Sequence, residues 1–236
     1  MATIRTFLAV NLSVPTIRAV TEAQGALRQA IGKSLRVAWV PPANQHLTLK
    51  FLGPTEAELA EAVGDVLVRG LAAQKPFEVK AVGMGAFPDE QRPRVLWVGL
   101  HDESGALKGL QADVEKWMEG LGFARESRPF SPHLTLGRVK EGHGSVAEAL
   151  GQFRDTVFGT SLIRDVTFYE SRLQAKGAEY VVLRRAVIGA PPPPPPRPPE
   201  RDTGPRPVVP EGPLEAVSEP DGIDVHTNDT ETSNGG

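Results

Sequence analysis

Aromatic residues stop at Tyr180 in a chain of 236 residues, and this boundary limits how much of the chain can build a hydrophobic core. Beyond it, 13 of the 22 prolines fall in residues 190–236, beginning with an unbroken run at 191–196. A segment rich in proline and acidic residues, without aromatic side chains, has too little apolar surface to offset the entropy of ordering it. We therefore expect a folded domain over residues 1–189 and a disordered, proline-rich acidic tail over residues 190–236.

The charge of the chain is unevenly distributed. The tail carries a net charge of −6, and residues 1–189 carry +3, within a total of −3. This mildly basic folded part is compatible with a phosphate-bearing ligand but is much weaker than a patch that coats nucleic acid. Cysteine is absent, which excludes disulfides, cysteine-bound metals and thiol nucleophiles. No apolar run approaches a membrane helix and no signal-peptide pattern is present, so we expect a cytoplasmic location and no membrane association.

Strand-like and helix-like patterns alternate over residues 1–189. Ser13 can cap a helix that has Pro15 in its first turn, and Thr55 with Glu58 forms a capping-box pattern that opens a second helix. We expect strands at residues 3–12, 36–40, 46–52, 77–86, 94–100 and 133–139, and a final pair of strands at 156–169 and 179–188. We expect helices at residues 13–31, 55–74 and 146–153, and a further helix that ends near residue 120.

The tetrapeptide His-Leu-Thr-Leu occurs at residues 46–49 and again, 87 residues later, at 133–136. Each copy follows a helix-like segment and is followed by another helix and two strands. This internal repeat predicts an α+β fold in which two similar lobes, each a sheet flanked by helices, form one domain.

Each copy of the tetrapeptide has two chemically different faces. Alternate side chains of a strand share a face, so His46 lies beside Thr48, and His133 beside Thr135, with the leucines opposite. If the two strands face each other, one imidazole can donate a proton while the other accepts one, and the two hydroxyls can hold the non-bridging oxygens of a phosphate. This set of groups indicates acid–base cleavage of a phosphodiester without a metal.

The two tetrapeptides resemble the paired H-x-T-x motifs of the 2H phosphoesterases. The more specific resemblance is to the bacterial and archaeal RNA 2′,3′-cyclic phosphodiesterases, also called 2′-5′ RNA ligases. The segment RTFLAV at residues 5–10, the segment HLTLKFLG at residues 46–53, and Pro132 and Arg138 around the second motif are similar to the same family. The resemblance covers residues 3–188.

This resemblance implies a bilobal, duplicated fold of sheets and helices with the active site in the cleft between the lobes. It implies hydrolysis of RNA 2′,3′-cyclic phosphate ends to 2′-phosphate ends, without a cofactor or a metal. It also implies that His46 is the proton donor to the leaving 3′-oxygen and that His133 is the proton acceptor that activates water. The expected partners are RNA ends or a small nucleotide substrate, and we expect a monomer.

Three further residues are candidates for substrate binding. Lys50, expected on the His46 face, and Arg138 are candidates for contacts with a flanking phosphate, although a solvated role is an alternative for both. Phe7 is a candidate for stacking on a base, with core packing as its alternative role. By strand alternation, Phe51 is expected to face the core, unless the strand bends after Lys50.

Other interpretations of the same residues differ in chemistry. A metal-dependent phosphoesterase could use His46 and His133 as ligands, but neither motif has a neighbouring cluster that supplies the remaining ligands. The chain could also act on another cyclic or 2′-5′-linked nucleotide, or be a non-catalytic RNA-binding module. The reverse reaction would join RNA ends through a 2′-5′ bond at the same site.

Overall fold

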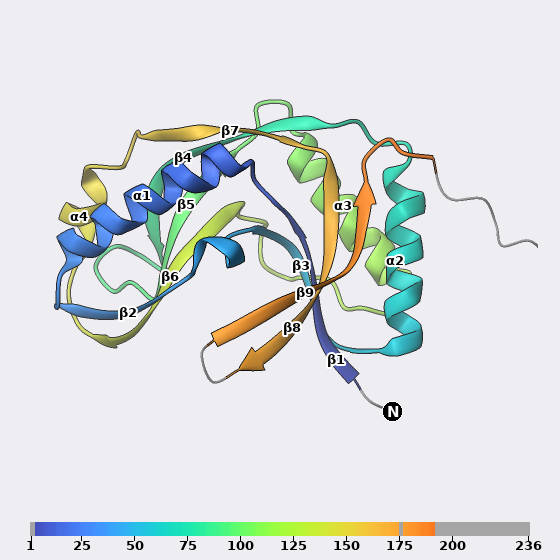
Figure 1. Cartoon of the computed structure of the whole chain (residues 1–236), viewed down its shortest axis with the longest axis horizontal. Helices are drawn as coiled ribbons and strands as arrows, with labels where there is room; N and C mark the ends of the chain where they lie inside the picture. Colours follow the sequence, from blue (N-terminus) through green and yellow to red (C-terminus); the bar gives the residue numbers. More distant parts are fainter. Residues whose placement is uncertain (1–2, 175–176, 192–236) are drawn as a thin grey trace, which may run out of the picture. The chain divides into compact units, whose positions relative to one another are not determined.

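A computed structural model describes residues 3–174 and 177–191 of the chain (Figure 1). The strands are β1 (Thr3–Val10), β2 (Leu35–Trp39), β3 (Leu47–Glu56), β4 (Phe77–Phe87), β5 (Val95–His101), β6 (His133–Gly142), β7 (Val157–Ile163), β8 (Asp165–Gln174) and β9 (Gly177–Val187). The helices are α1 (Val14–Ile31), α2 (Ala57–Leu71), α3 (Ala106–Glu119), α4 (Ala147–Gly151) and the 3₁₀ helix η1 (Pro42–Asn44). The expected disordered tail lies outside the described residues, apart from Ala190 and Pro191. Within the described part, the helices are too short or too polar to cross a membrane.

The strands form one antiparallel sheet in the order β7-β4-β5-β6-β3-β1-β8-β9, and β2 pairs with β6. Most neighbouring strands are paired over four or more positions, as β1 and β8 are. Strands β3 and β6, in contrast, are paired at Leu47 and Leu134. The sheet therefore consists of two halves joined at a short junction.

Each half of the sheet has its own pair of helices. Helix α2 packs on β9 and α3, and α3 packs on β3, whereas α1 packs on β7 and α4 (Figure 1). The α+β class and the two-lobed fold are confirmed. The halves are not two consecutive pieces of sequence, however, because β8 and β9 complete the half that contains β1 and β3.

The expected helix starts have different outcomes. Ser13 caps α1, because its hydroxyl accepts a hydrogen bond from the backbone N–H of Thr16. The capping box expected at Thr55 is wrong, because β3 continues to Glu56 and the Thr55 hydroxyl forms a buried hydrogen bond of 2.7 Å with the hydroxyl of Thr6. The Thr55 side chain is therefore used in the contact between β3 and β1 and does not cap α2.

The single long strand expected at residues 156–169 is also wrong. The strand is interrupted at Arg164. As a result, β7 pairs with β4 in one half of the sheet, and β8 pairs with β1 and β9 in the other half. This interruption allows the polypeptide to cross from one half of the sheet to the other.

We predict that Leu134→Ala destabilises the protein by about 2–5 kcal/mol, since it leaves a cavity at the junction, where Leu134 is fully buried. Leu173→Ala, at a position that is 79% exposed, should change the free energy of unfolding by less than about 0.5 kcal/mol. Urea denaturation of both variants measures the difference. Equal stabilities would contradict a junction that belongs to the cooperative core.

Candidate active site

The pairing of Leu47 with Leu134 determines where the two motifs lie relative to each other. In an antiparallel pair, the residue before one partner faces the residue after the other, so His46 lies next to Thr135 and Thr48 lies next to His133. The four side chains are half-buried and share the face opposite the two buried leucines. Facing side chains at such a pair have Cβ atoms about 4.5–5.5 Å apart. The structure therefore brings the two histidines and two threonines to one place at the junction.

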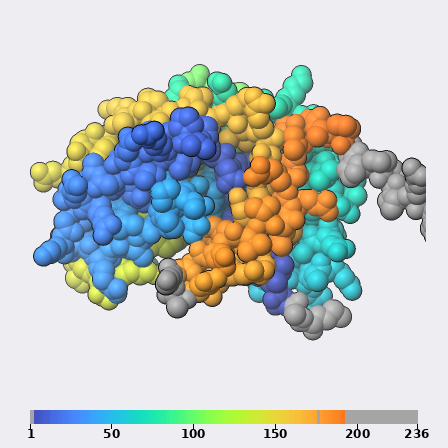
Figure 2. Space-filling view, in the orientation of Figure 1, coloured from blue at the N-terminus to red at the C-terminus, as the bar shows by residue number. Residues whose placement is uncertain are grey.

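Both imidazoles are held by the backbone two residues earlier in the chain. The Nδ1 atom of His133 lies 2.7 Å from the carbonyl oxygen of Ser131, and the His46 ring is hydrogen-bonded to the backbone of Asn44. Because Nδ1 of His133 donates to a carbonyl, its Nε2 is left as a proton acceptor. The Asn44 side chain in turn donates to the Ala178 carbonyl at 2.7 Å, and Figure 2 shows η1 and β9 side by side on this face.

An aromatic cluster surrounds His46. The Phe7 ring stacks on the imidazole with 4.9 Å between centroids, and the Tyr180 ring meets it edge-on at 5.2 Å. The centroid of the Tyr169 ring lies 5.2 Å from that of Phe7 and 6.1 Å from that of the imidazole, so the three rings form a compact group. Phe7 is only 1% exposed, so it supports the imidazole from within the cluster and does not offer an open surface to a base.

Burial shifts both histidines in the same direction. Loss of water around His46 lowers its pKa to about 4, although the hydrogen bond to Asn44 opposes the shift. Burial also lowers the pKa of His133, and the positive charge of Arg138 adds to that effect. Both imidazoles are therefore neutral at pH 7 in the protein without substrate.

The two motif strands share the same irregularity. In the pairing of β3 with β1, Leu49 is an extra residue without a partner, and in the pairing of β6 with β5, Leu136 is the extra residue. Both leucines are the third residue after the motif histidine. A β-bulge at this point reverses the alternation of the side chains that follow it.

This bulge corrects two expectations from simple alternation. Phe51, expected in the core, is 62% exposed. Its ring lies on the His46 side of the sheet, with its centroid 5.8 Å from that of Phe7. Lys50, expected beside His46, is instead 5% exposed, and its ammonium donates to Glu115 at 2.6 Å and to the Ala124 carbonyl at 2.7 Å. Lys50 is thus engaged in a buried ion pair that ties β3 to α3 and to the loop leading to β6.

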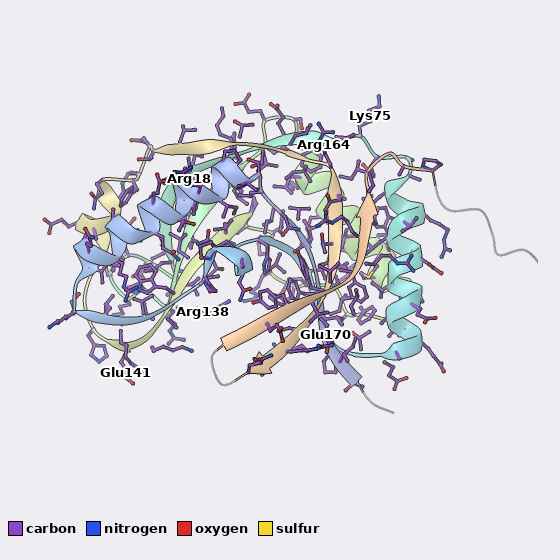
Figure 3. The ribbon with its side chains drawn as sticks, viewed as in Figure 1. Arg18, Lys75, Arg138, Glu141, Arg164 and Glu170 are labelled. Carbon is purple, nitrogen blue, oxygen red and sulfur yellow. The ribbon has the colours of Figure 1, made fainter. Side chains whose placement is uncertain are left out.

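Arg138, in contrast, lies on the exposed side of the site. It pairs with Val95 of β5, and its charge lowers the pKa of His133 and opposes the burial effect that raises the pKa of Tyr180. Figure 3 shows the labelled side chain between β2 and the β8–β9 hairpin. Arg138 is therefore close enough to both sides of the junction to face an anion bound there.

Several aromatic residues of the site were not identified from sequence. Phe87 meets the His133 ring edge-on at 5.0 Å and lies 5.1 Å from Trp97, while Tyr169 and Tyr180 are the two tyrosines of the chain. The alternation of residues 95–100 does place Trp97 opposite the core. Its position beside the histidines depends on which strand pairs with β6.

The described residues contain no group of three or more His, Cys, Asp or Glu side chains arranged to hold a metal ion. The charged groups identified around the two histidines are arginines, Arg5 near Tyr180 and Arg138 near both His133 and Tyr180. Such a site is suited to an anion.

Comparison with known proteins agrees with this arrangement. The family model described as the 2′-5′ RNA ligase superfamily matches residues 7–174. A protein of Aquifex aeolicus named RNA 2′,3′-cyclic phosphodiesterase is 30% identical over 177 residues, covering 74% of this chain and 94% of its own. A protein of the same name from Thermus thermophilus is 36% identical over 191 residues, covering 77% and 88%.

Solved structures show the same fold. The crystal structure of TT0787 of Thermus thermophilus has a TM-score of 0.62 and 30% identity, covering 79% of this chain and 98% of that one. That of Escherichia coli LigT complexed with 3′-AMP has a TM-score of 0.64 over 80% and 99% of the two chains, with 23% identity. The fold and the paired motifs define a 2H phosphoesterase. The chain belongs to the 2′-5′ RNA ligase superfamily.

We predict that Lys50→Met destabilises the protein by about 3–5 kcal/mol, because it leaves the carboxylate of Glu115 buried without its partner. Lys80→Met, which removes an exposed ion pair with Glu103, should cost about 0–1 kcal/mol. The double variant Lys50→Met/Glu115→Leu should recover most of the loss. Chemical denaturation tests this, and a Lys50→Met protein as stable as Lys80→Met would refute it.

Proposed function

We propose that this protein is an RNA 2′,3′-cyclic phosphodiesterase that opens the cyclic phosphate at an RNA end and leaves a 2′-phosphate. The observation that carries the proposal is the Leu47–Leu134 pair, which places both His-x-Thr motifs on one face of the sheet. Membership of the family and the names of the relatives in Aquifex aeolicus and Thermus thermophilus support the same substrate class.

In this proposal the bound phosphate lies between the two motifs. The hydroxyls of Thr48 and Thr135 donate to its non-bridging oxygens, and the guanidinium of Arg138 balances its negative charge. His133 removes a proton from a water molecule as that water attacks phosphorus. The bond between phosphorus and the 3′-oxygen breaks, and His46 donates its proton to that oxygen. The products are a 2′-phosphomonoester and a 3′-hydroxyl.

The low pKa of His46 is compatible with a proton donor once substrate is bound. In the free protein, burial among aromatic rings disfavours the imidazolium. A phosphate anion placed beside the ring favours the charged form and raises its pKa. The substrate itself thus helps His46 to be protonated when the proton is needed.

The direct test is incubation of the purified protein with a short RNA that ends in a 2′,3′-cyclic phosphate, in the presence of EDTA. We expect an RNA with a 2′-phosphate end. A 3′-phosphate would reverse the pairing of the histidines with the ribose oxygens. Turnover that requires a divalent ion would support a metal-dependent phosphoesterase, and binding without turnover would support an RNA-binding module.

Joining of RNA ends through a 2′-5′ bond is the reverse of the same reaction. Excess water favours hydrolysis, so we propose the hydrolytic direction as the function.

We predict that His46→Ala and His133→Ala each lower kcat by at least about 10²-fold, the usual effect of removing a general acid or base. Thr48→Ala and Thr135→Ala should lower it less, because each removes one hydrogen bond to phosphate. His101→Ala, at an exposed position at the end of β5, is the matched control and should retain normal activity. Near-normal turnover in either motif-histidine variant would refute the mechanism.

The pH dependence follows from the two lowered pKa values. Activity requires one protonated and one neutral imidazole, so the rate should pass through a maximum between the two pKa values. Because burial lowers both, the maximum of kcat/KM should lie below pH 6.5. The maximum of kcat should lie at higher pH, since bound phosphate raises the pKa of His46. Single-turnover pH profiles measure both, and a kcat/KM maximum above pH 7 would contradict the assignment.

A further inference from the structure

One face of β5 carries an indole ring directly beside the candidate active site. Trp97 pairs with Thr135 of β6 on one side and with Gly85 of β4 on the other. Its neighbours Leu96 and Val98 are fully buried, so Trp97 points to the opposite face, which also carries Thr135. The strands β6, β5 and β4 lie side by side in Figure 1.

The absence of a side chain at Gly85 allows this ring to lie close to the sheet. A Cβ atom at Gly85 would overlap the six-membered ring of Trp97 at its Cζ2 atom. A Cβ atom at Gly99 would instead meet the backbone of β4, at 2.8 Å from the Val82 carbonyl oxygen. Glycine weakens a strand interior, and its presence there often marks a close approach to the backbone. The indole therefore lies across the β4–β5 backbone as a flat platform.

A cavity of about 600 Å³ adjoins this platform. Its lining includes Trp97, residues 82–86 of β4, residues 89–91 of the following connection, and Arg154. Phe87 lies between the cavity and the active site. The centroid of its ring is 5.1 Å from the centroid of the Trp97 ring and 5.0 Å from that of the His133 ring. The cavity is large enough for a small-molecule ligand.

The polar groups of the cavity disfavour a phosphate. The guanidinium of Arg154 is paired with Glu90 at 3.2 Å, and the Asp89 carboxylate accepts backbone N–H groups of Gln91 and Arg92. With two carboxylates and one guanidinium, the lining has a net charge of −1. An uncharged aromatic ring with N–H donors at its edge fits these surroundings, and a nucleobase is such a ring.

The buried indole N–H of Trp97 is a second unusual feature. It has no hydrogen-bond acceptor among the described residues. A buried tryptophan with a purely structural role usually finds such an acceptor. The position of the ring is therefore explained by the space above Gly85 and by the cavity that the ring lines, and not by a hydrogen bond.

We propose that this cavity, which we term the Trp97 subsite, binds the nucleobase of the nucleoside that carries the cyclic phosphate, stacked on the indole. The inference rests on the proposed function, since it assumes that the phosphate lies at Thr135. Adjacent strands are about 4.8 Å apart, so a ribose attached to that phosphate would extend from β6 across β5. The base would then lie over β5 and β4, where the cavity is.

The first test compares two substrates with and without a base, adenosine 2′,3′-cyclic phosphate and methyl riboside 2′,3′-cyclic phosphate. The unaltered protein should prefer the adenosine substrate by about 5- to 150-fold in kcat/KM, the usual worth of one base–aromatic stack. Trp97→Leu should abolish most of this preference, mainly through KM. Trp117→Leu, in a tryptophan that packs against Gly70 of α2, is the matched control and should retain it.

The ratio of the two substrates separates a binding role from structural damage, because damage lowers both activities together. Gly85→Ala gives an independent variant, since its methyl group displaces the ring. It should reduce the ratio of kcat/KM for the adenosine substrate to kcat/KM for the methyl riboside. Equal preference ratios in Trp97→Leu, Trp117→Leu and the unaltered protein would overturn the proposal.

A binding measurement keeps the inference separate from the proposed function. The chain has three tryptophans, so the variant Trp39→Phe/Trp117→Phe leaves Trp97 as the single indole. Titration with 2′-AMP should quench its fluorescence, and inorganic phosphate at the same concentrations should not. Failure to hydrolyse either substrate would refute the proposed function alone, whereas unquenched Trp97 emission at saturating 2′-AMP would refute the subsite alone.

Discussion

The pairing of Leu47 with Leu134 is the contact on which the rest of the site depends. Each half of the sheet is held together by long antiparallel ladders and by its own helices, but the halves meet through this short junction. Because both leucines are buried, the flanking histidines and threonines are directed to the opposite face. Two motifs that are far apart in the sequence thereby become one group of four side chains.

The duplicated β-bulge adds a second constraint to this junction. In both strands the extra residue is the third after the histidine, so the fifth residue after it returns to the active face. That residue is Phe51 in β3 and Arg138 in β6. The two strands therefore share the same bulged geometry, while the side chain at this position is an aromatic ring in β3 and a cation in β6. The same bulge turns Lys50 into the interior, where Glu115 neutralises it.

The surroundings of the two histidines explain how one site can hold both an acid and a base. Aromatic rings remove water from His46, which lowers its pKa, and backbone carbonyls orient both imidazoles. In the proposed reaction, the bound phosphate places a negative charge beside the two imidazoles and favours the protonated form of His46. Trp97 and Phe87 extend the aromatic surface on the His133 side, so the two lobes provide different surroundings for similar motifs.

The repeated His-Leu-Thr-Leu segment and the alternation of strands and helices were sufficient to predict the α+β class and the two-lobed fold. The cap at Ser13 was predictable because it depends on neighbouring residues. The positions of Lys50, Phe51 and Thr55 were not, because a bulge and cross-strand pairing override the local pattern. The aromatic cluster of Phe7, Tyr169 and Tyr180 likewise follows from strand order. Sequence patterns depend on residues that are neighbours along the chain. The side of the sheet to which a side chain points after a bulge depends instead on the partner strand, and only the tertiary structure determines which strand that is.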